Sequence, residues 1–418
     1  MLNNYICALD IGSSKLVAAI ARIKKGRIMD IFFETEISKG VKEGSIVDSI
    51  ELIGCINRLL KNLKVKSEIK IKTLYMNVSG QDVLTKHAHA IIPLAERGNK
   101  VITVSDLQKV NEQARVLGSS LDEEIIHQIP YSYSIDSKSN IGNPLGLYSH
   151  KLEVDLYLVC AKVSSIQSFS RVINQAGYEL KDLFLSGIST AYAVFNKDFK
   201  TGLNVLCDIG SDNTEIIIYK DGVVRNIEVL RIGGDTITQA IARELGISFD
   251  LAEDVKRSYA SVGDYEQLPQ EKEILIKKDK VYKPIKQRLA AQTATTQVKA
   301  ICEKIKDVVE KHAALNEINN FVVCGRAVLL EGFLEMLEGD LGIPVKLGRV
   351  NQSDLNVFIN KEEFLSGHKY LSFLTALGII CHALHDDEQP QFVHLKDPAQ
   401  NPLKKAITLV RELYQEYF

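Results

Sequence analysis

Two short turns in the sequence carry residue types suited to binding phosphate and a metal ion. The first reads Asp-Ile-Gly-Ser-Ser-Lys at residues 10–15, and the second reads Asp-Ile-Gly-Ser-Asp-Asn-Thr at residues 208–214. A small turn after a strand presents backbone N–H groups to phosphate oxygens. Gly12 allows close backbone approach, and Ser13, Ser14 and Lys15 add hydroxyl and ammonium donors. Asp10 and Asp208 would repel phosphate, so they are predicted to hold Mg²⁺ through water or to orient an attacking water.

The two turns belong to an internal repeat. Each sits in the plan strand, turn, strand, turn, strand, and the copies start about 200 residues apart, near the midpoint of the chain. One copy alone would favour a simple strand-ending turn, because short motifs recur by chance. Two copies in matching contexts favour two related halves that face each other.

Two other glycine turns are candidates for binding as well. Gly233 and Gly234 precede a helix that is expected to end at Gly246, and the N-terminal amides of that helix can face an anion. A tight turn capped by Asp235 explains the same residues equally well. Gly325 follows an apolar strand and can bring the backbone close to a flat nucleoside, which alone is a weak signal.

The remaining pattern predicts an inserted unit and several helices. Between the repeats, strands are expected at 83–94, 124–129 and 152–160, with a helix capped by Ser105. Helices are also expected at 164–176, 186–195 and 233–245, from 248, and at 295–312, with hairpins and loops at 264–287. Residues 386–402 have linker composition.

Composition excludes several classes of function. The 418 residues carry a formal charge of −2, which gives no bulk electrostatic basis for binding nucleic acid. Seven scattered cysteines without a Cys-x-x-Cys pair indicate reduced thiols and no structural zinc. His87 and His89 should share one face of a strand as surface residues rather than metal ligands. No signal peptide and no apolar stretch long enough to cross a bilayer is expected.

The final segment predicts an amphipathic helix at residues 403–418. Its apolar side is formed by Leu403, Ile407, Val410, Leu413, Tyr414, Tyr417 and Phe418. Such a helix can lie in a membrane interface or dock on a protein surface, and the residues favour neither. Two glutamates and the terminal carboxylate balance its three basic residues, so attraction to anionic lipid would be weak.

Four motifs in this order carry a family resemblance. ALDIGSSK, LCDIGSDNTEIIIY, VVCGRAVLLEG and FLTALGII resemble the phosphate-1, phosphate-2, adenosine and second connecting motifs of the actin, heat-shock chaperone and sugar-kinase ATPases. Within that superfamily the chain resembles the FtsA family of bacterial cell-division proteins. Residues 127–162 are similar to the subdomain that this family inserts in its first half, and residues 231–256 to its segment entering the fourth subdomain. The tail is similar to the family's linker and membrane-targeting helix, which favours the membrane interpretation.

The resemblance implies an α/β actin-like ATPase fold with two related halves around a nucleotide cleft and an inserted small α+β subdomain. The expected boundaries are 1–81 with 163–197 and 355–385 for subdomain 1A, 82–162 for 1C, 198–228 with 303–354 for 2A, and 229–302 for 2B. A linker at 386–402 and a membrane-targeting helix at 403–418 would complete the chain.

The resemblance also implies a function and a set of site residues. The protein would bind ATP and Mg²⁺, polymerise on the cytoplasmic face of the cell membrane at the septum, bind the C-terminal tail of the tubulin-like FtsZ on its fourth subdomain, and recruit later septal proteins. It would be a scaffold with at most slow ATP hydrolysis. Asp10, Gly12, Ser13, Ser14 and Lys15 would contact Mg²⁺ and phosphates from one side, Asp208, Gly210 and Thr214 from the other, and Gly233, Gly234, Gly325 and, near adenine, Lys256 the nucleoside.

The chain departs from the family pattern in two places. Ser211, Asp212 and Asn213 replace further glycines after Gly210, and Asp212 puts negative charge near the phosphates. Arg326 replaces the second glycine of the adenosine motif, where it can obstruct the backbone's approach or stack on the base. Binding with slow or absent catalysis is therefore expected. The alternatives are a small-molecule kinase of the same superfamily and a pilus-assembly adaptor of similar fold.

Overall fold

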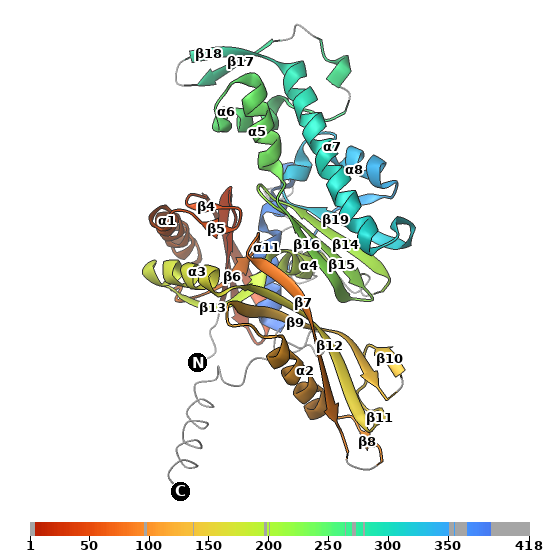
Figure 1. Ribbon diagram of the computed structural model, residues 1–418. Coiled ribbons are helices and arrows are strands. Elements are labelled where there is room, and N and C mark those ends of the chain that lie inside the picture. The colour runs from red at the N-terminus through yellow and green to blue at the C-terminus, as the bar shows by residue number, and fades with distance from the viewer. Residues whose placement is uncertain are drawn as a thin grey trace. The chain divides into compact units, whose positions relative to one another are not determined.

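The computed structural model describes residues 5–385 except 96–97, 137, 196–198, 200, 264, 270–272, 279–280, 351–354 and 356–365 (Figure 1). The predicted linker at 386–402 and helix at 403–418 lie outside the described residues. The chain divides into two compact units, each considered by itself below. Unit 1 comprises Met1–Thr85, Ser120–Ile126 and Val159–Asp387, and unit 2 comprises Lys86–Ser119, His127–Leu158 and Glu388–Phe418.

The first half of unit 1 is built on a five-stranded sheet with the order β13-β6-β1-β2-β3. Its strands are β1 (Tyr5–Ile11), β2 (Lys15–Lys24), β3 (Arg27–Ile37), β6 (Thr73–Val78) and β13 (Glu179–Leu185). β2 is antiparallel to both of its neighbours, whereas β1, β6 and β13 are parallel. The strands predicted around the first turn are confirmed.

The second half repeats this topology with the order β16-β15-β14-β19-β20. Its strands are β14 (Leu203–Ile209), β15 (Thr214–Lys220), β16 (Val223–Leu230), β19 (Ile318–Cys324) and β20 (Val345–Leu347). An equivalent backbone hydrogen bond closes each turn. Gly12 N donates to Lys15 O at 3.1 Å, and Gly210 N donates to Asn213 O at 2.9 Å. The duplication predicted from the two turns therefore extends to five strands in each half.

Four helices cover the two faces of the first sheet. They are α1 (Ser49–Ser67), α3 (Val163–Gln175), α4 (Ser186–Val194) and α11 (Leu374–His385). α1 and α3 share a core with Cys7, Leu9 and Ile11 of β1. Because side chains alternate along a strand, Ala8 and Asp10 face the opposite side. There α11 packs against β1, β2, β6 and α4, and α4 also packs against β14 of the second sheet.

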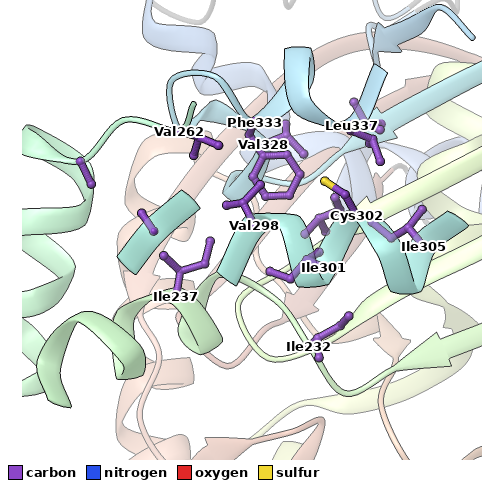
Figure 2. Packing of buried hydrophobic residues seen from close by; sticks show 14 of the residues in the cluster. Ile232, Ile237, Val262, Val298, Ile301, Cys302, Ile305, Val328, Phe333 and Leu337 are labelled. Carbon is purple, nitrogen blue, oxygen red and sulfur yellow. The ribbon is translucent and has the colours of Figure 1, made fainter. Parts of the chain in front are cut away.

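The second half has its own hydrophobic core. It is formed by β14, β15 and β19 with α5 (Gly234–Leu245), α6 (Phe249–Tyr259), α7 (Gln287–His312) and α8 (Phe333–Leu341). Figure 2 shows Ile301, Cys302 and Ile305 of α7 beside Phe333 and Leu337 of α8. The hairpin predicted before α7 is confirmed as β17 (Glu273–Lys278) and β18 (Val281–Lys286).

The start of α7 was predicted wrongly, since the helix begins at Gln287 rather than near residue 295. Its first two turns bury Ala290, Ala291 and Ala294. Alanine is the strongest helix former but contributes little hydrophobic contrast. The periodicity of larger apolar residues therefore begins later than the helix does.

Unit 2 contains most of a four-stranded sheet with the order β10-β9-β12-β7. The strands are β7 (Val83–Pro93), β9 (Glu123–Ile135), β10 (Lys138–Ile141) and β12 (Lys151–Lys162), and β8 (Lys100–Val101) pairs with β11 (Tyr148–Ser149). The helix α2 (Val104–Gly118) is capped by Thr103 rather than by Ser105 as predicted. Thr103 and Asp106 form a reciprocal capping box, which satisfies two N-terminal amides.

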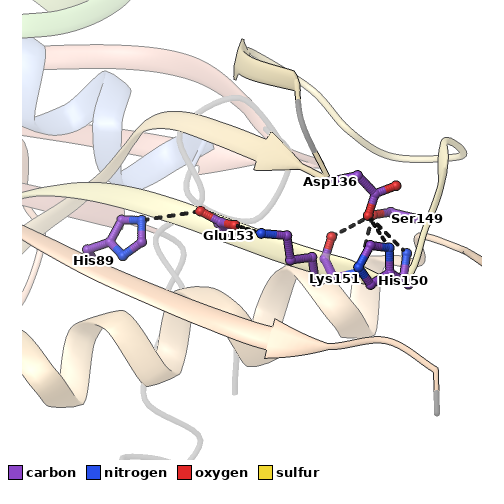
Figure 3. A network of polar contacts seen from close by, with 6 residues as sticks. All are labelled: His89, Asp136, Ser149, His150, Lys151 and Glu153. Carbon is purple, nitrogen blue, oxygen red and sulfur yellow. Dashed lines mark hydrogen bonds and ion pairs between the residues drawn. The ribbon is translucent and has the colours of Figure 1, made fainter.

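The histidines of unit 2 pair with carboxylates. His87 Nδ1 lies 2.9 Å from Asp155, and His89 Nε2 lies 3.8 Å from Glu153, which also pairs with Lys151 (Figure 3). Both ring side chains are about half exposed, as predicted. Across the described ranges, no group of three or more His, Cys, Asp or Glu residues is arranged to hold a metal ion.

None of the helices within the described ranges combines the length and hydropathy needed to span a bilayer.

Candidate functional site

A cavity of about 1350 Å³ in unit 1 brings the two turns together. Its wall also includes the N-terminus of α5, one face of α6, the turn after β19 and the start of α11. The lining contains most of the residues singled out from the sequence, namely Asp10, Gly12, Ser13, Ser14, Lys15, Asp208, Gly210, Gly234, Lys256, Gly325 and Arg326. Residues separated by about half the chain thus face one space.

Thr214 and Gly233 lie next to this cavity but do not line it. The Thr214 hydroxyl donates to Ile232 O at 2.8 Å, and the side chain is fully buried. It lies on the face of β15 that carries Ile216 and Ile218 into the hydrophobic core, as strand alternation requires. Gly233 packs against the carbonyl groups of Gly210 and Ser211.

Asp10 is held by an asparagine from a neighbouring strand. Asn77 Nδ2 donates to Asp10 Oδ1 at 2.8 Å and to Ser186 Oγ at 2.9 Å, while Asn77 Oδ1 accepts from Ile11 N at 2.7 Å. Burial raises the pKa of Asp10 to about 7, with Lys15 opposing the rise and Asp208 adding to it. The carboxyl group is therefore oriented before any ligand binds.

The charge of Lys15 interacts with the carboxyl groups of both Asp10 and Asp208. Burial lowers the pKa of Lys15 to about 8, against the attraction of Asp10 and Asp208. A buried ammonium group gains most from a nearby anion, because little water competes for its charge. Lys15 is thus placed to meet a phosphate group.

Asp208 is fixed by the helices between the sheets. Thr190 Oγ1 donates to Asp208 Oδ2 at 3.1 Å and lies 3.1 Å from Thr375 Oγ1, the second residue of α11. Burial raises the pKa of Asp208. Gly325 passes so close that a Cβ atom there would lie 2.9 Å from Asp208 Oδ1 and 2.1 Å from Ile209 O, and its φ of +83° also suits glycine.

Glu215 is a third carboxyl group of the cavity that sequence reasoning missed. It is the cross-strand partner of Asp208, and it is only 4% exposed. Gly187 N donates to Glu215 Oε2 at 2.6 Å, whereas the buried Oε1 has no hydrogen-bond partner. Burial, reinforced by Asp208 and Asp10, raises the pKa of Glu215 to about 8. The sequence signal that could have identified Glu215 is an acidic residue followed directly by three isoleucines in a strand.

The N-terminus of α5 is bonded to the second turn. Gly234 N donates to Gly210 O at 2.9 Å, and Asp235 N donates to Ser211 O at 2.8 Å. Lys256, which is 8% exposed, bonds Gly234 O at 3.0 Å, Thr238 Oγ1 at 2.8 Å and Glu253 Oε2 at 2.6 Å. Lys256 therefore secures α6 to the start of α5 with its donors already engaged.

Asp212 connects the two halves. Its Oδ2 accepts from Glu43 N at 2.8 Å, in the turn between β4 (Val41–Lys42) and β5 (Ser45–Ile46). It also hydrogen-bonds Asp235, and burial together with this contact raises the pKa of Asp235 to about 7. A carboxylate thus occupies a turn whose counterpart in the first half carries Ser14 at the same register.

Arg326 lines the cavity beside Gly325. Burial and the charge of Arg257 lower its pKa. Arg257 itself pairs with Glu253 at 2.6 Å, so two arginine side chains border the cavity and one of them is already paired with a carboxylate. Planar cations of this type bind phosphates bidentately or stack on rings.

The donors of the cavity fit a magnesium polyphosphate. Asp10, Asp208 and Glu215 do not form a group that could hold the ion directly, but their oxygen atoms, including the unpartnered Oε1 of Glu215, suit hydrogen bonds to the waters that Mg²⁺ keeps. Ser13, Ser14 and Lys15 supply donors to phosphate, and the glycines leave room for it. Acidic side chains elsewhere on the wall oppose such a ligand, and Asp212 adds negative charge within the second turn itself.

Comparison with known proteins gives a consistent result. The sequence model of "Cell division protein FtsA" matches residues 205–378, and that of the "SHS2 domain inserted in FTSA" matches residues 80–160. The chain is 25% identical to the cell division protein FtsA of Borreliella burgdorferi over 97% of this chain and 96% of that protein. It is 27% identical to FtsA of Pseudomonas aeruginosa over 61% of each chain.

A solved structure of the PilM-PilN type IV pilus biogenesis complex has a similar fold. The TM-score is 0.64 at 14% identity, with 91% of this chain and 98% of that chain covered. This likeness concerns the fold, which is that of the actin-like ATPases, whereas the matching sequence models and relatives concern the family. The chain belongs to the FtsA family of cell division proteins.

Proposed function

We propose that the protein is an ATP-binding, actin-like scaffold of cell division that polymerises on the cytoplasmic face of the membrane and anchors FtsZ there. The observation that carries the nucleotide part is the convergence of two identically bonded Asp-Ile-Gly turns on one cavity. The family relationship supports the division part.

The candidate residues in and beside the cavity have proposed roles in binding ATP and Mg²⁺. Gly12, Ser13, Ser14 and Lys15 bind phosphates from the first half, and Gly210 binds them from the second. Asp10 and Asp208 hold the waters of Mg²⁺, and Glu215 positions a further water. Gly325 and Arg326 border the nucleoside, with Gly234 at the start of α5. Thr214, Gly233 and Lys256 act by holding these backbone segments in place.

Slow hydrolysis is part of the proposal. Efficient phosphoryl transfer relies on positive charge around the transferred group, and Asp212 adds negative charge. Lys15 would bind the phosphate charge of ATP, and the two turns would contact the nucleotide from both halves. The nucleotide therefore acts as a structural link between the halves more than as a substrate.

The variant Asp212→Asn is expected to bind a fluorescent ATP analogue about tenfold more tightly than the wild-type chain. A unit charge removed a few ångströms from phosphate, in a partly screened site, changes the binding free energy by roughly 1–2 kcal/mol. The dissociation constant from fluorescence anisotropy is the readout. Asp221→Asn, the same change at a turn outside the cavity lining, should leave the constant unchanged. Equal or weaker binding by Asp212→Asn would contradict this role.

Attachment to the membrane is proposed for the segment at 403–418. Its apolar face of Leu403, Ile407, Val410, Leu413, Tyr414, Tyr417 and Phe418 suits insertion among headgroups and acyl chains. The β17–β18 hairpin, within the fourth subdomain proposed at 229–302, exposes Leu275 and Tyr282 at 64% and 59%. Apolar side chains at the tip of a subdomain suit the docking of a short peptide, here the FtsZ tail.

A chain ending at Pro402 is expected to lose sedimentation with lipid vesicles, and FtsZ should then no longer be carried to them. The assay uses vesicles, FtsZ from the same organism, and the full-length or shortened chain, with and without ATP. The shortened chain should bind the ATP analogue as the full chain does, which controls for folding. Lipid binding that survives the truncation would refute the membrane anchor, and FtsZ that sediments equally without this protein would refute the FtsZ anchor.

A further inference from the structure

The end of the first sheet that points away from the cavity carries a concentrated positive charge. The cavity end is defined by Asp10 of β1 and Lys15 of β2, so Tyr5 and the β2–β3 turn lie at the opposite end. Seven basic residues occur there, which we call the remote basic surface: Lys24, Lys25, Arg27, Lys64, Lys70, Lys72 and Lys181.

Hydrogen bonds place these residues at one end. Lys72 N donates to Tyr5 Oη at 2.8 Å, which sets the connection between α1 and β6 beside the start of β1. Arg22, next to the β2–β3 turn, donates to Ser67 O at 3.3 Å, which brings the last turn of α1 to the same place. Glu179 N donates to Lys72 O, so β13 also begins there. Three segments distant in sequence therefore form one surface.

The charge of this surface is available to a partner. All seven side chains are exposed, and none forms an ion pair with another described residue. Exposed acidic residues nearby are Glu68, Glu179 and Asp182, fewer than half as many. Arg22 and Lys66 are already paired with Asp30 and Glu34 and add nothing.

The last described helix leads from the cavity across the first sheet. α11 starts at the cavity, where Thr375 lies 3.1 Å from Thr190, and packs along β1, β2 and β6. Twelve residues of helix span about 18 Å. Near the end of α11, His382 lies 4.3 Å from Phe184 between ring centroids, so the described helix ends on the side of the sheet formed by β13, the strand that carries Lys181 of the remote basic surface, with residues 386–418 still to follow.

The following residues cannot supply electrostatic attraction to an acidic membrane. Residues 386–418 contain six acidic and four basic residues. An amphipathic helix of this charge contributes apolar insertion, and firm attachment of a weak anchor commonly needs a polybasic second contact. The remote basic surface has the charge that the tail lacks.

We infer that the remote basic surface binds the headgroups of anionic phospholipids and orients the first half of the protein toward the membrane. The inference rests on the proposed membrane attachment. It adds that the folded part of the protein binds the lipid charge, whereas the apolar face of the tail inserts into the membrane. Binding should weaken with salt, because exposed charges are screened beyond about 8 Å at physiological ionic strength.

Three full-length variants with equal change of charge test this inference. Lys24→Gln, Lys25→Gln and Arg27→Gln are combined in the first, and Lys64→Gln, Lys70→Gln and Lys72→Gln in the second. The control combines Lys109→Gln, Lys299→Gln and Lys304→Gln, which are exposed on α2 and α7. Partitioning is measured with vesicles of phosphatidylcholine alone and with vesicles that also contain phosphatidylglycerol.

Both test variants should lose about tenfold or more of their affinity for the anionic vesicles, and the control less than twofold. On neutral vesicles all chains should bind alike. Wild-type affinity of the test variants for anionic vesicles would overturn the inference, and would also be the result if the acidic run at 386–388 covered the surface. An equal loss in the control, or a loss on neutral vesicles, would overturn it too. The truncation at Pro402 on neutral vesicles tests the tail separately.

Discussion

The free energy of unfolding of the variant Glu215→Gln is expected to exceed that of the wild-type protein by about 3–5 kcal/mol near pH 9, and by less than about 1 kcal/mol near pH 5. Burial raises the pKa of Glu215 to about 8 from 4.5, so the folded protein binds this proton more tightly than the unfolded chain does. The stabilisation is complete below the unfolded pKa and is lost as pH rises through about 8. Glutamine resembles the protonated acid but cannot ionise.

Urea unfolding of the nucleotide-free protein in the presence of a chelator, followed by circular dichroism across this pH range, measures the difference. The amide oxygen of glutamine can still accept from Gly187 N, which preserves the hydrogen bond that the wild-type side chain accepts. Glu317→Gln, an exposed acid far from the cavity lining, provides the control and should not alter the pH profile. A difference between Glu215→Gln and wild type that stays constant from pH 5 to pH 9 would rule out buried ionisation.

A methyl group added to Gly378 is expected to destabilise the protein by about 3 kcal/mol or more, enough to lower the yield of folded chain. Gly378 lies in α11 where this helix crosses α4. A Cβ atom there would lie 1.6 Å from Ser189 O and 2.3 Å from Ser189 C. Both obstacles are backbone atoms, so relief requires the two helices to separate, and Thr190 and Thr375 would separate with them.

Gly339→Ala is the matched control for this change. Gly339 lies in α8, is exposed, and has no atom within 4 Å of the position a Cβ would take. Alanine should therefore raise the free energy of unfolding by about 0.5–1 kcal/mol through helix propensity. Denaturation midpoints of the two variants should move in opposite directions. A midpoint for Gly378→Ala at or above wild type would show that α4 and α11 are not so closely packed.

The duplicated architecture was accessible from the sequence because its signals are local. Each Asp-Ile-Gly turn follows a strand, and the aspartate has the same position relative to the turn in both copies. Since strand side chains alternate, Asp10 and Asp208 must lie on equivalent faces of their sheets. The same rule could have separated Thr214, in register with the buried Ile216, from its neighbour Glu215, which faces the cavity.

The interactions that tune the site were not accessible in the same way. Asn77 reaches Asp10 from 67 residues away, and Asp212 meets Glu43 N from 169 residues away. Such contacts depend on how separate strands and loops pack, which no local pattern encodes. Thr103 rather than Ser105 caps α2, because Asp106 completes a reciprocal capping box with Thr103. The local pattern did not distinguish between these two neighbouring hydroxyl residues.

α7 is a long continuous helix that connects the cavity with β16 of the second sheet. Its first residue, Gln287, borders the cavity and bonds Tyr259 O at 3.1 Å, and its last, His312, meets Glu228 of β16 at 3.4 Å. A continuous helix of 26 residues is about 39 Å long. A tilt of about 5° at one end displaces the other by about 3 Å, so a small change of angle beside the cavity becomes a larger displacement at the end of the helix that meets β16.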